Sequence, residues 1–439
     1  MTSAEHVIWW HVYPLGFVGA DTTGADRTPA TRLPDLIGWL DHLLELGANG
    51  LALGPVFDSS THGYDTIDYF RVDPRLGTED DLVALIDAAH ARGIDVMLDG
   101  VFNHVGPDFP ALRTARQNPA SPEARLFEQD PDGALVAFEG HGGLITLNHG
   151  ATEVADLVTE VMTYWCERGV DAWRLDAAYT VPIDFWSRVL PAVRERHPQV
   201  YVMGEVIHGD YAAFVQAGGM DAVTQYELWQ GIWHAIADHN LHELDHALGR
   251  HNGFLETFVP YTFVGNHDVT RIASQVGDEH LDHALALLLT LGGTPSIYYG
   301  DEFGLRAVKE ERAGGDDAIR PAFGSPGADP IQVPGARPEV LALHQELIGL
   351  RRRHAWLHTA RSRTVAVGND SITVEVTGTE ADGEQSLIVC LNIGDDDVRT
   401  PAAQFLAGRR AGLDGGELVV GPHGWAVAGP AQDSSPSGG

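Results

Sequence analysis

The stretch Asp95–His104, DVMLDGVFNH, passes from apolar residues into a polar ending, and this pattern recurs along most of the chain. From Val7 to about Tyr299, short apolar runs of strand character alternate with polar loops and with segments of helical periodicity. This alternation predicts an α/β fold in which parallel strands are joined by crossover helices, and eight strands suit a closed (β/α)8, or TIM, barrel. The eight candidate strands are Val7–Tyr13, Gly50–Phe57, Asp95–Asn103, Val170–Asp176, Tyr201–Glu205, Met220–Tyr226, Thr262–Asp268 and Ser296–Gly300.

The helical segments have apolar faces and clear end signals. One face is formed by Leu36, Ile37, Leu40, Leu43 and Leu44, and a second by Val154, Leu157, Val158, Val161 and Trp165. Each of these segments stops at a glycine, Gly47 or Gly169, and Gly93 follows the helix that starts near Thr78. We expect a left-handed cap at these glycines, before the chain enters the next strand.

Two stretches depart from the repeat and define the expected domains. Residues 105–148 have weak periodicity, and because a loop of this length usually has a function, we expect a short inserted domain after the third strand. Residues 359–430 contain β-rich stretches separated by Gly/Asp turns, which predicts a small antiparallel C-terminal β-domain. The barrel then comprises 1–104 and 149–358, and 431–439 has the composition of a disordered tail.

The composition restricts the possible partners and the location. With 62 acidic against 28 basic residues the net charge is −34, a field that repels phosphate backbones and anionic lipid surfaces, so neither nucleic acid nor a membrane is an expected partner. Two cysteines, Cys166 and Cys390, suggest buried thiols in a reducing compartment. The first residues lack a signal-peptide pattern, and no apolar run is long enough to span a bilayer, so we expect a cytoplasmic protein.

Polar residues close several otherwise apolar strands. Besides DVMLDGVFNH, they occur in WRLDAA (Trp173–Ala178), VMGEV (Val202–Val206) and FVGNHD (Phe263–Asp268). In a barrel, catalytic groups project from the C-terminal ends of the strands, so three of these endings place a carboxylate on one rim. An Asp nucleophile, a Glu proton donor and a second Asp are the groups that cleavage of a glycosidic bond requires. Any one of them alone could equally cap a loop, but four coordinated endings favour a catalytic site.

These four segments resemble, in the same order, the conserved regions of the α-amylase family of glycoside hydrolases. The resemblance implies that Asp176 is the nucleophile, Glu205 the general acid/base and Asp268 the transition-state stabiliser. It further implies that Arg174 holds the nucleophile ionised and that the β-domain is the family's domain C. The remaining substrate-site residues that it implies are Tyr64 as an aromatic platform, Asp99 as a structural carboxylate, His104 and His267 as ligands of sugar hydroxyls, and Arg320.

Within the family the chain resembles the cyclomaltodextrinase, neopullulanase and maltogenic amylase group, on GYDTIDYFRVDPRLGT (Gly63–Thr78) and on His208 after GEV. The resemblance implies an oligosaccharide substrate with α-1,4 linkages, linear or cyclic, with tolerance of α-1,6 linkages, including cyclic tetrasaccharides with alternating linkages. Ile207 stands where the group has tryptophan, and LITLN (Leu144–Asn148) differs from its usual signatures. Two alternatives remain: a transglycosylase or isomerase that uses the same covalent intermediate, and an inactive binding homologue.

Three further signals carry less weight. HELDH (His242–His246) matches the H-E-x-x-H zinc pattern, but it lies where a barrel has its outer helices, and we interpret it as a solvated face. Tyr226, Trp229 and Trp233 suit a sugar-stacking platform and ordinary packing equally well. No cofactor is required by this reading; calcium is possible at Asn103, but no set of six to eight oxygen ligands is evident. A homodimer is possible.

Overall fold

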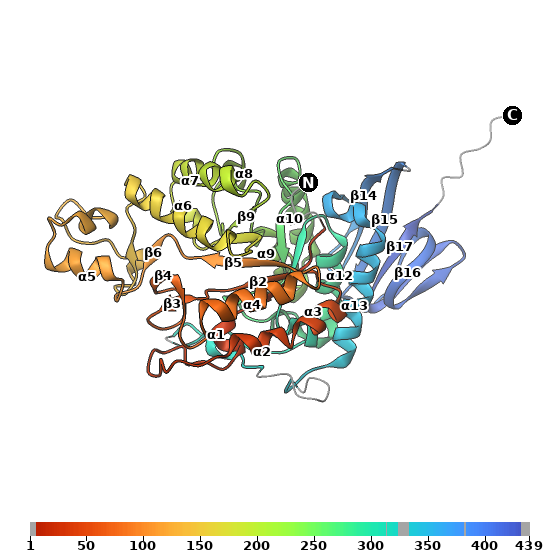
Figure 1. Cartoon of the computed structure of the whole chain (residues 1–439). Coiled ribbons are helices and arrows are strands. Elements are labelled where there is room, and N and C mark those ends of the chain that lie inside the picture. Colours follow the sequence, from red (N-terminus) through yellow and green to blue (C-terminus); the bar gives the residue numbers. More distant parts are fainter. Residues whose placement is uncertain (1–5, 313, 324–332, 382, 432–439) are drawn as a thin grey trace. The chain divides into compact units, whose positions relative to one another are not determined.

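The computed structural model describes residues 6–312, 314–323, 333–381 and 383–431. The chain divides into two compact units, residues 1–224 with 309–334 and residues 225–308 with 335–439, and each is described by itself. Figure 1 follows the elements along the chain. The predicted tail at 431–439 lies outside the described residues, except for its first residue. Within the described ranges, no helix is both long and apolar enough to cross a membrane.

The strands of the first unit form a parallel sheet in the order β10-β9-β8-β5-β2-β1. Almost every residue in them is buried, as expected for parallel strands that are covered on both faces. Their bounds are β1 (Trp9–Val12), β2 (Gly50–Leu53), β5 (Asp95–Gly100), β8 (Ala172–Leu175), β9 (Tyr201–Gly204) and β10 (Ala222–Val223).

The second unit contributes two more parallel strands, β11 (Tyr261–Phe263) and β12 (Thr294–Tyr298), which pair with each other. The eight predicted strands are therefore present among the described residues, and the fold is a (β/α)8 barrel with an additional C-terminal antiparallel sheet. The eighth strand begins at Thr294, two residues before the predicted start, and ends two residues early.

The helices of the first unit confirm the predicted caps. Gly47, Gly93 and Gly169 all adopt positive φ, at 95°, 72° and 100°. Thr78 caps α4 in a capping box with Asp81, in which each side chain accepts a hydrogen bond from the other residue's backbone N–H. The bounds are α1 (Pro14–Phe17), α2 (Leu33–Ile37), α3 (Leu40–Leu46), α4 (Glu79–His90), α5 (Pro110–Gln117), α6 (Thr152–Cys166), α7 (Ile183–Arg196) and α8 (Tyr211–Gln216).

Two small antiparallel pairs complete the first unit. β3 (Phe57–Ser59) and β4 (Thr66–Val72) form a hairpin after β2, which the sequence pattern did not predict. β6 (His104–Val105) pairs with β7 (Ile145–Thr146) and closes the insertion after β5. In Figure 1 the insertion, with α5, forms a small lobe to the left of α6 and α7.

The C-terminal half of the second unit is the predicted antiparallel sheet, with strand order β13-β14-β15-β17-β16. Buried side chains such as Cys390, Leu418 and Val420 form a core of this sheet. The strands are β13 (Arg361–Val367), β14 (Ser371–Glu380), β15 (Gly383–Asn392), β16 (Val398–Asp414) and β17 (Glu417–Pro430). The helices of this unit are α9 (Tyr226–Ala237), α10 (Leu241–Phe254), α11 (Ile272–Gln275), α12 (Gly277–Thr290) and α13 (Pro338–Arg353).

Candidate active site

The guanidinium of Arg174, near the end of β8, links three carboxylates. Nη1 donates to both carboxylate oxygens of Asp99, at 2.8 and 2.6 Å, and lies 3.2 Å from Oδ1 of Asp176. Nη2 lies 2.9 Å from Oε1 of Glu205. All four residues are at least nine-tenths buried, so these ion pairs are poorly screened by water. The sequence predicted the contact between Arg174 and Asp176; the structure adds Asp99 and Glu205.

The charge state of Arg174 follows from these neighbours. Burial alone would lower the pKa of the guanidinium, but the carboxylates of Asp99, Glu205 and Asp176 outweigh it and raise that pKa well above its ordinary value. Arg174 is therefore a permanent positive charge in the middle of the carboxylate group.

The backbone at the ends of β8 and β9 sets the positions of Asp176 and Glu205. The amide of Asp176 donates to Gly100 O at 3.0 Å, and the amide of Glu205 donates to Leu175 O at 2.9 Å. The next residue, Ala177, has φ 45°, a left-handed conformation that is uncommon for a residue with a side chain. Its N–H donates to Oε2 of Glu205 at 3.0 Å. The turn after β8 thus holds Glu205 in place, and such strain is common at functional sites.

Tyr64 and His104 extend this group of contacts around Arg174. The hydroxyl of Tyr64 donates to Oδ2 of Asp99 at 3.2 Å, and Nε2 of His104 lies 3.0 Å from the carbonyl oxygen of Tyr64. A carbonyl oxygen only accepts, so Nε2 carries the proton. Burial lowers the pKa of His104 to about 4, and its imidazole is therefore neutral near pH 7. The ring of Phe138, from the insertion, stacks on the His104 ring with centroids 4.7 Å apart.

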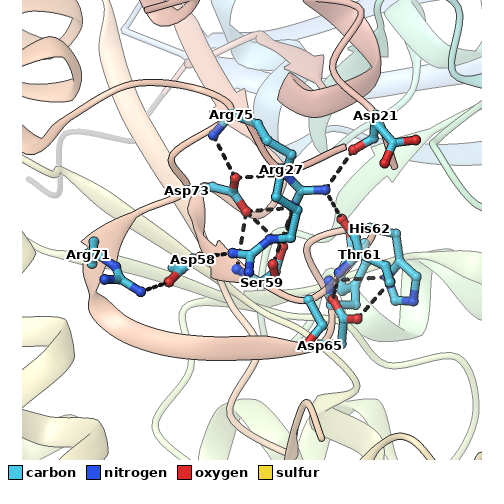
Figure 2. Close-up of polar contacts among 12 residues, drawn as sticks. Asp21, Arg27, Asp58, Ser59, Thr61, His62, Asp65, Arg71, Asp73 and Arg75 are labelled. Carbon is cyan, nitrogen blue, oxygen red and sulfur yellow. Dashed lines mark hydrogen bonds and ion pairs between the residues drawn. The ribbon is translucent and has the colours of Figure 1, made fainter. Parts of the chain in front are cut away.

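A buried polar network anchors the loop that carries Tyr64 (Figure 2). Arg75, which is 1% exposed, pairs with Asp73 and donates to the backbone carbonyls of Asp21 and Thr61. Thr61 in turn donates to Asp65 from its N–H and its hydroxyl, at 3.0 and 2.6 Å, which closes a tight loop around Tyr64. A second ion-pair group, in which Arg27 and Arg71 hold the buried Asp58, lies beside it.

Arg320 lies against the same loop. Its guanidinium carbon is 4.7 Å from the centre of the Tyr13 ring, and Nη2 pairs with Asp316 at 3.1 Å. The Tyr13 hydroxyl donates to the carbonyl oxygen of His62 at 2.7 Å. Burial raises the pKa of Tyr13 to about 12, so the phenol stays neutral.

Several residues in this unit were missed by the sequence analysis. Tyr13 directly follows the first strand, and this position at a strand end could have identified it as a candidate site residue. Phe138 and Glu139 come from the insertion, where no periodicity points to them, and Tyr179 donates to Oε1 of Glu139 at 2.9 Å. The Tyr179 ring also lies 5.0 Å from that of His208.

His267 and Asp268 lie together in the second unit, in the loop that follows β11. Nε2 of His267 is 3.0 Å from Oδ2 of Asp268, and the amide of Asp268 donates to the side chain of Asn266 at 2.8 Å. The Asn266 amide donates to the hydroxyl of Tyr226 at 3.0 Å. His267 is buried, whereas the Asp268 side chain is 33% exposed and so is accessible to a ligand.

The aromatic residues of α9 in the second unit pack against each other and against β11. The Tyr226 and Trp229 rings lie 5.7 Å apart, Trp229 and Trp233 lie 5.9 Å apart, and Trp229 stacks on Phe263 at 6.2 Å. Trp229 and Trp233 are half-buried. These contacts account for the aromatic residues as packing, and the partly exposed faces leave the sugar-platform alternative open.

Neither of the two candidate metal sites, at Asn103 and in HELDH, has a matching ligand set among the described residues. The side-chain amide of Asn103 lies 3.1 Å from Nδ1 of His104, and among the described residues no group of three His, Cys, Asp or Glu ligands includes either residue. The neighbour of the Asn103 side chain is thus a nitrogen, whereas Ca²⁺ takes oxygen ligands, and the proposed reaction involves no calcium. His242 and His246 are exposed on α10 and belong to no such group in the described ranges.

The structure thus brings together Tyr64, Asp99, His104, Arg174, Asp176 and Glu205, places Arg320 in the same unit, and pairs His267 with Asp268 in the other unit. Comparison with known proteins gives this arrangement a family. The α-amylase catalytic-domain model matches residues 11–134 and 137–364.

Individual relatives agree with that match. A cyclomaltodextrinase from a Bacillus species is 29% identical over an alignment of 435 positions, which covers 88% of this chain and 73% of that protein. A maltogenic α-amylase of Bacillus acidopullulyticus is 32% identical over 69% of this chain, which spans only 56% of that protein. The solved cyclic α-maltosyl-(1→6)-maltose hydrolase of Arthrobacter globiformis, in complex with the cyclic sugar of its name, is 26% identical, with a TM-score of 0.80 over 98% of this chain and 100% of that one. Because the family model covers well over half of its residues, the chain belongs to the α-amylase family of glycoside hydrolases.

Proposed function

We propose that this protein hydrolyses α-glucosidic bonds in short malto-oligosaccharides with retention of configuration, with Asp176 as the nucleophile and Glu205 as the acid/base. The observation that carries the proposal is the buried contact of one guanidinium, that of Arg174, with both carboxylates. Two carboxylates that contact one guanidinium lie near each other, and in retaining glycosidases the pair is only about 5–5.5 Å apart.

The proposed reaction has two displacements. In the first, Asp176 attacks the anomeric carbon while the glycosidic C–O bond breaks, and protonated Glu205 gives its proton to the leaving oxygen. In the second, ionised Glu205 takes a proton from water, whose oxygen attacks the anomeric carbon and releases Asp176. The two inversions restore the α configuration.

The remaining residues position the sugar. We assign Asp268 to the third carboxylate, which stabilises positive charge as it develops at the anomeric centre, with His267 beside it. Tyr64 offers its ring to the sugar face while its hydroxyl is fixed by Asp99. We assign His104 to the sugar hydroxyls, one of which would replace the Tyr64 carbonyl as the acceptor of its Nε2–H. Arg320 lies on the Tyr13 ring, whose hydroxyl donates to the loop that carries Tyr64. Arg174 keeps Asp176 ionised because its own charge is permanent.

The comparisons support cyclic and branched substrates as the class to examine first. The chain covers 73% of the Bacillus cyclomaltodextrinase and 100% of the Arthrobacter globiformis hydrolase, which is named for a cyclic sugar with an α-1,6 bond. We therefore propose cyclic tetrasaccharides with alternating α-1,4 and α-1,6 linkages as substrates, alongside linear and cyclic maltodextrins.

We also propose a cytoplasmic location, and a homodimer is the assembly to be tested. Cys166 and Cys390 are buried free thiols, which suits a reducing compartment. A relative that is 29% identical over 69% of this chain is named an intracellular maltogenic amylase of Bacillus subtilis. Light scattering of the purified protein tests the assembly, and a monomer at micromolar concentration rules the homodimer out.

Product analysis tests the reaction. The wild type and the Asp176→Asn variant are incubated with linear, cyclic and branched malto-oligosaccharides, and the products are followed by chromatography and proton NMR. We expect α-anomeric products from the wild type and a loss of several orders of magnitude in rate for the variant. Products longer than the substrate identify a transglycosylase or isomerase instead. If neither protein acts on any α-glucan, the substrate class is wrong.

A further inference from the structure

Two histidines and a carboxylate meet where α12 packs on β17, within the second unit. His280, in the first turn of α12, has Nε2 3.0 Å from Nδ1 of His423 on β17. One ligand atom from each of Glu279, His280 and His423 lies within 4.8 Å of the others. Among the residues that the structure describes, this is the only group of three or more His, Cys, Asp or Glu side chains with such spacing. The proposed reaction uses none of them.

A carboxylate lies beside the ring nitrogen of His423 that faces away from His280. Nε2 of His423 lies 3.3 Å from Oδ1 of Asp395. Of the two facing ring nitrogens, one donates and the other accepts, so a metal ion that binds both takes the place of the shared proton. Metal-binding histidines usually have such a carboxylate on the nitrogen that does not bind the metal. Nδ1 of His423 is therefore the nitrogen that lies on the side of the other two candidate ligands.

The backbone fixes this arrangement at a cost. His423 has φ 52°, although it lies inside a strand and carries a side chain, and Arg410 on the neighbouring strand β16 has the same φ. One turn after His280, Nε2 of His283 lies 3.1 Å from the carbonyl of Asn392 and 2.9 Å from that of Gly424, which holds α12 in register with the sheet. Because these contacts position both elements, the two ligand nitrogens are already close before any ion binds.

We propose that Glu279, His280 and His423 bind a divalent transition-metal ion of the zinc type, with water as the fourth ligand. Two nitrogens and one carboxylate oxygen suit Zn²⁺ or Co²⁺ and are a poor set for Ca²⁺ or Mg²⁺. Two ligands at about 2.0–2.1 Å from a tetrahedral ion are about 3.3 Å apart, so the nitrogens need to separate by only about 0.3 Å. The bound ion would join α12 to the C-terminal sheet.

The charged side chains around the site would allow a metal ion to replace a weak ion pair. Arg410 faces the site, with Nη1 3.4 Å from Oε1 of Glu279, and both side chains are more than half exposed. Such a pair contributes little, so Glu279 can turn to the metal while Arg410 turns to solvent.

Metal titration of the full chain tests the proposal. After chelator treatment, Zn²⁺ binding is measured by calorimetry and Co²⁺ binding by visible absorption, for the wild type and for His280→Gln and His423→Asn. Asparagine tolerates the left-handed conformation of residue 423. His242→Gln, in the exposed HELDH segment, is the matched control. We expect one equivalent of tetrahedral Co²⁺ in the wild type and in the control, and an affinity at least about tenfold lower in both ligand variants.

Thermal melting separates a lost ligand from a lost fold. Zn²⁺ should raise the melting temperature of the wild type and of His242→Gln, and leave that of His280→Gln unchanged. If a histidine variant melts early without metal, Glu279→Gln on the exposed side of the site replaces it. The proposal is overturned if the wild type binds neither ion, or if the ligand variants bind as well as the control. Glycosidase activity is not the readout, so this outcome is independent of the proposed reaction.

Discussion

Arg174 is the residue on which the proposed chemistry depends most directly, because its planar guanidinium contacts Asp99, Asp176 and Glu205. A lysine would keep the positive charge but lacks the fork that reaches three carboxylates at once. We expect Arg174→Lys to lower kcat by about 10²–10³-fold, as removal of a preorganised electrostatic contact does in other enzymes, with a much smaller change in KM.

Steady-state kinetics on a maltodextrin, with circular dichroism to confirm folding, measures this effect. Arg196→Lys is the control, because Arg196 forms an ion pair at the surface, where its side chain is 59% exposed. Activity of Arg174→Lys within threefold of the control would contradict the role of Arg174.

At the residue scale, strand endings were the informative signal. Asp176 and Glu205 close predicted strands, and the structure gathers them with Arg174 and Asp99. Asp99 lies in the middle of its predicted strand but next to the observed end of β5. The contact of Arg174 with Glu205 was not predictable, because it depends on the distance between neighbouring strand ends. Phe138 was missed for a similar reason, since its partner His104 precedes the insertion and is distant from Phe138 in the sequence.

At the scale of elements, the β3–β4 hairpin and the loop between its strands position Tyr64, and Arg75 anchors both. Arg75 is buried and binds Asp73 and two backbone carbonyls, so Arg75→Met leaves a buried carboxylate without its counter-ion and these carbonyls without the guanidinium donor. We expect a loss of about 3–5 kcal/mol in unfolding free energy, the usual cost of breaking a buried ion pair. We also expect a raised KM, since the loop would lose its fixed position.

Denaturant unfolding and kinetics of Arg75→Met check both effects. Arg113→Met is the matched control, because Arg113 also pairs with an aspartate, Asp108, but is 62% exposed, and its loss should cost less than about 1 kcal/mol. Equal losses for the two variants would show that the buried network does not anchor the loop.

The sequence pattern predicted the elements better than their ends. β5 ends at Gly100, but the next residues, Val101 and Phe102, are also apolar and buried. Because the apolar run continues beyond the last paired residue, the predicted strand was too long. The eighth strand was placed too late because Gly293–Thr294–Pro295 reads as a turn, whereas Pro295 lies inside the strand. The β3–β4 hairpin was missed because its pairing shifts register twice and its loop is polar.

At the scale of the whole molecule, acid stability should depend on buried histidines. Burial lowers the pKa of His104, His251 and His283 to about 4 each, from an ordinary value of 6.5. Each is neutral in the folded protein, but in the unfolded chain it takes up a proton as soon as the pH falls below 6.5. The stability that they contribute is therefore fully present above pH 6.5 and is lost as the pH falls toward 4.

Acidification also increases the stability contributed by other groups, so the effect of one histidine on stability has to be isolated with a variant. Burial raises the pKa of Asp301 to about 6, and its stability contribution grows as the pH falls. His251 is suited to the test because its hydrogen-bond partners belong to neither proposed site: Nε2 lies 2.9 Å from the carbonyl of Gly292 and Nδ1 3.3 Å from Nε2 of Gln225. Glutamine at position 251 can donate to the same carbonyl but has no group that titrates.

We expect His251→Gln to lose less stability than the wild type between pH 7.5 and pH 5, by about 2 kcal/mol, the cost of a proton that only the unfolded histidine binds. Denaturant midpoints at the two pH values measure this difference, and contributions from Asp301 and the other carboxylates cancel because both proteins contain them. His246→Gln, at an exposed position of the same helix α10, should behave as the wild type. A pH dependence of His251→Gln equal to that of the wild type would mean that residue 251 is not held neutral by burial.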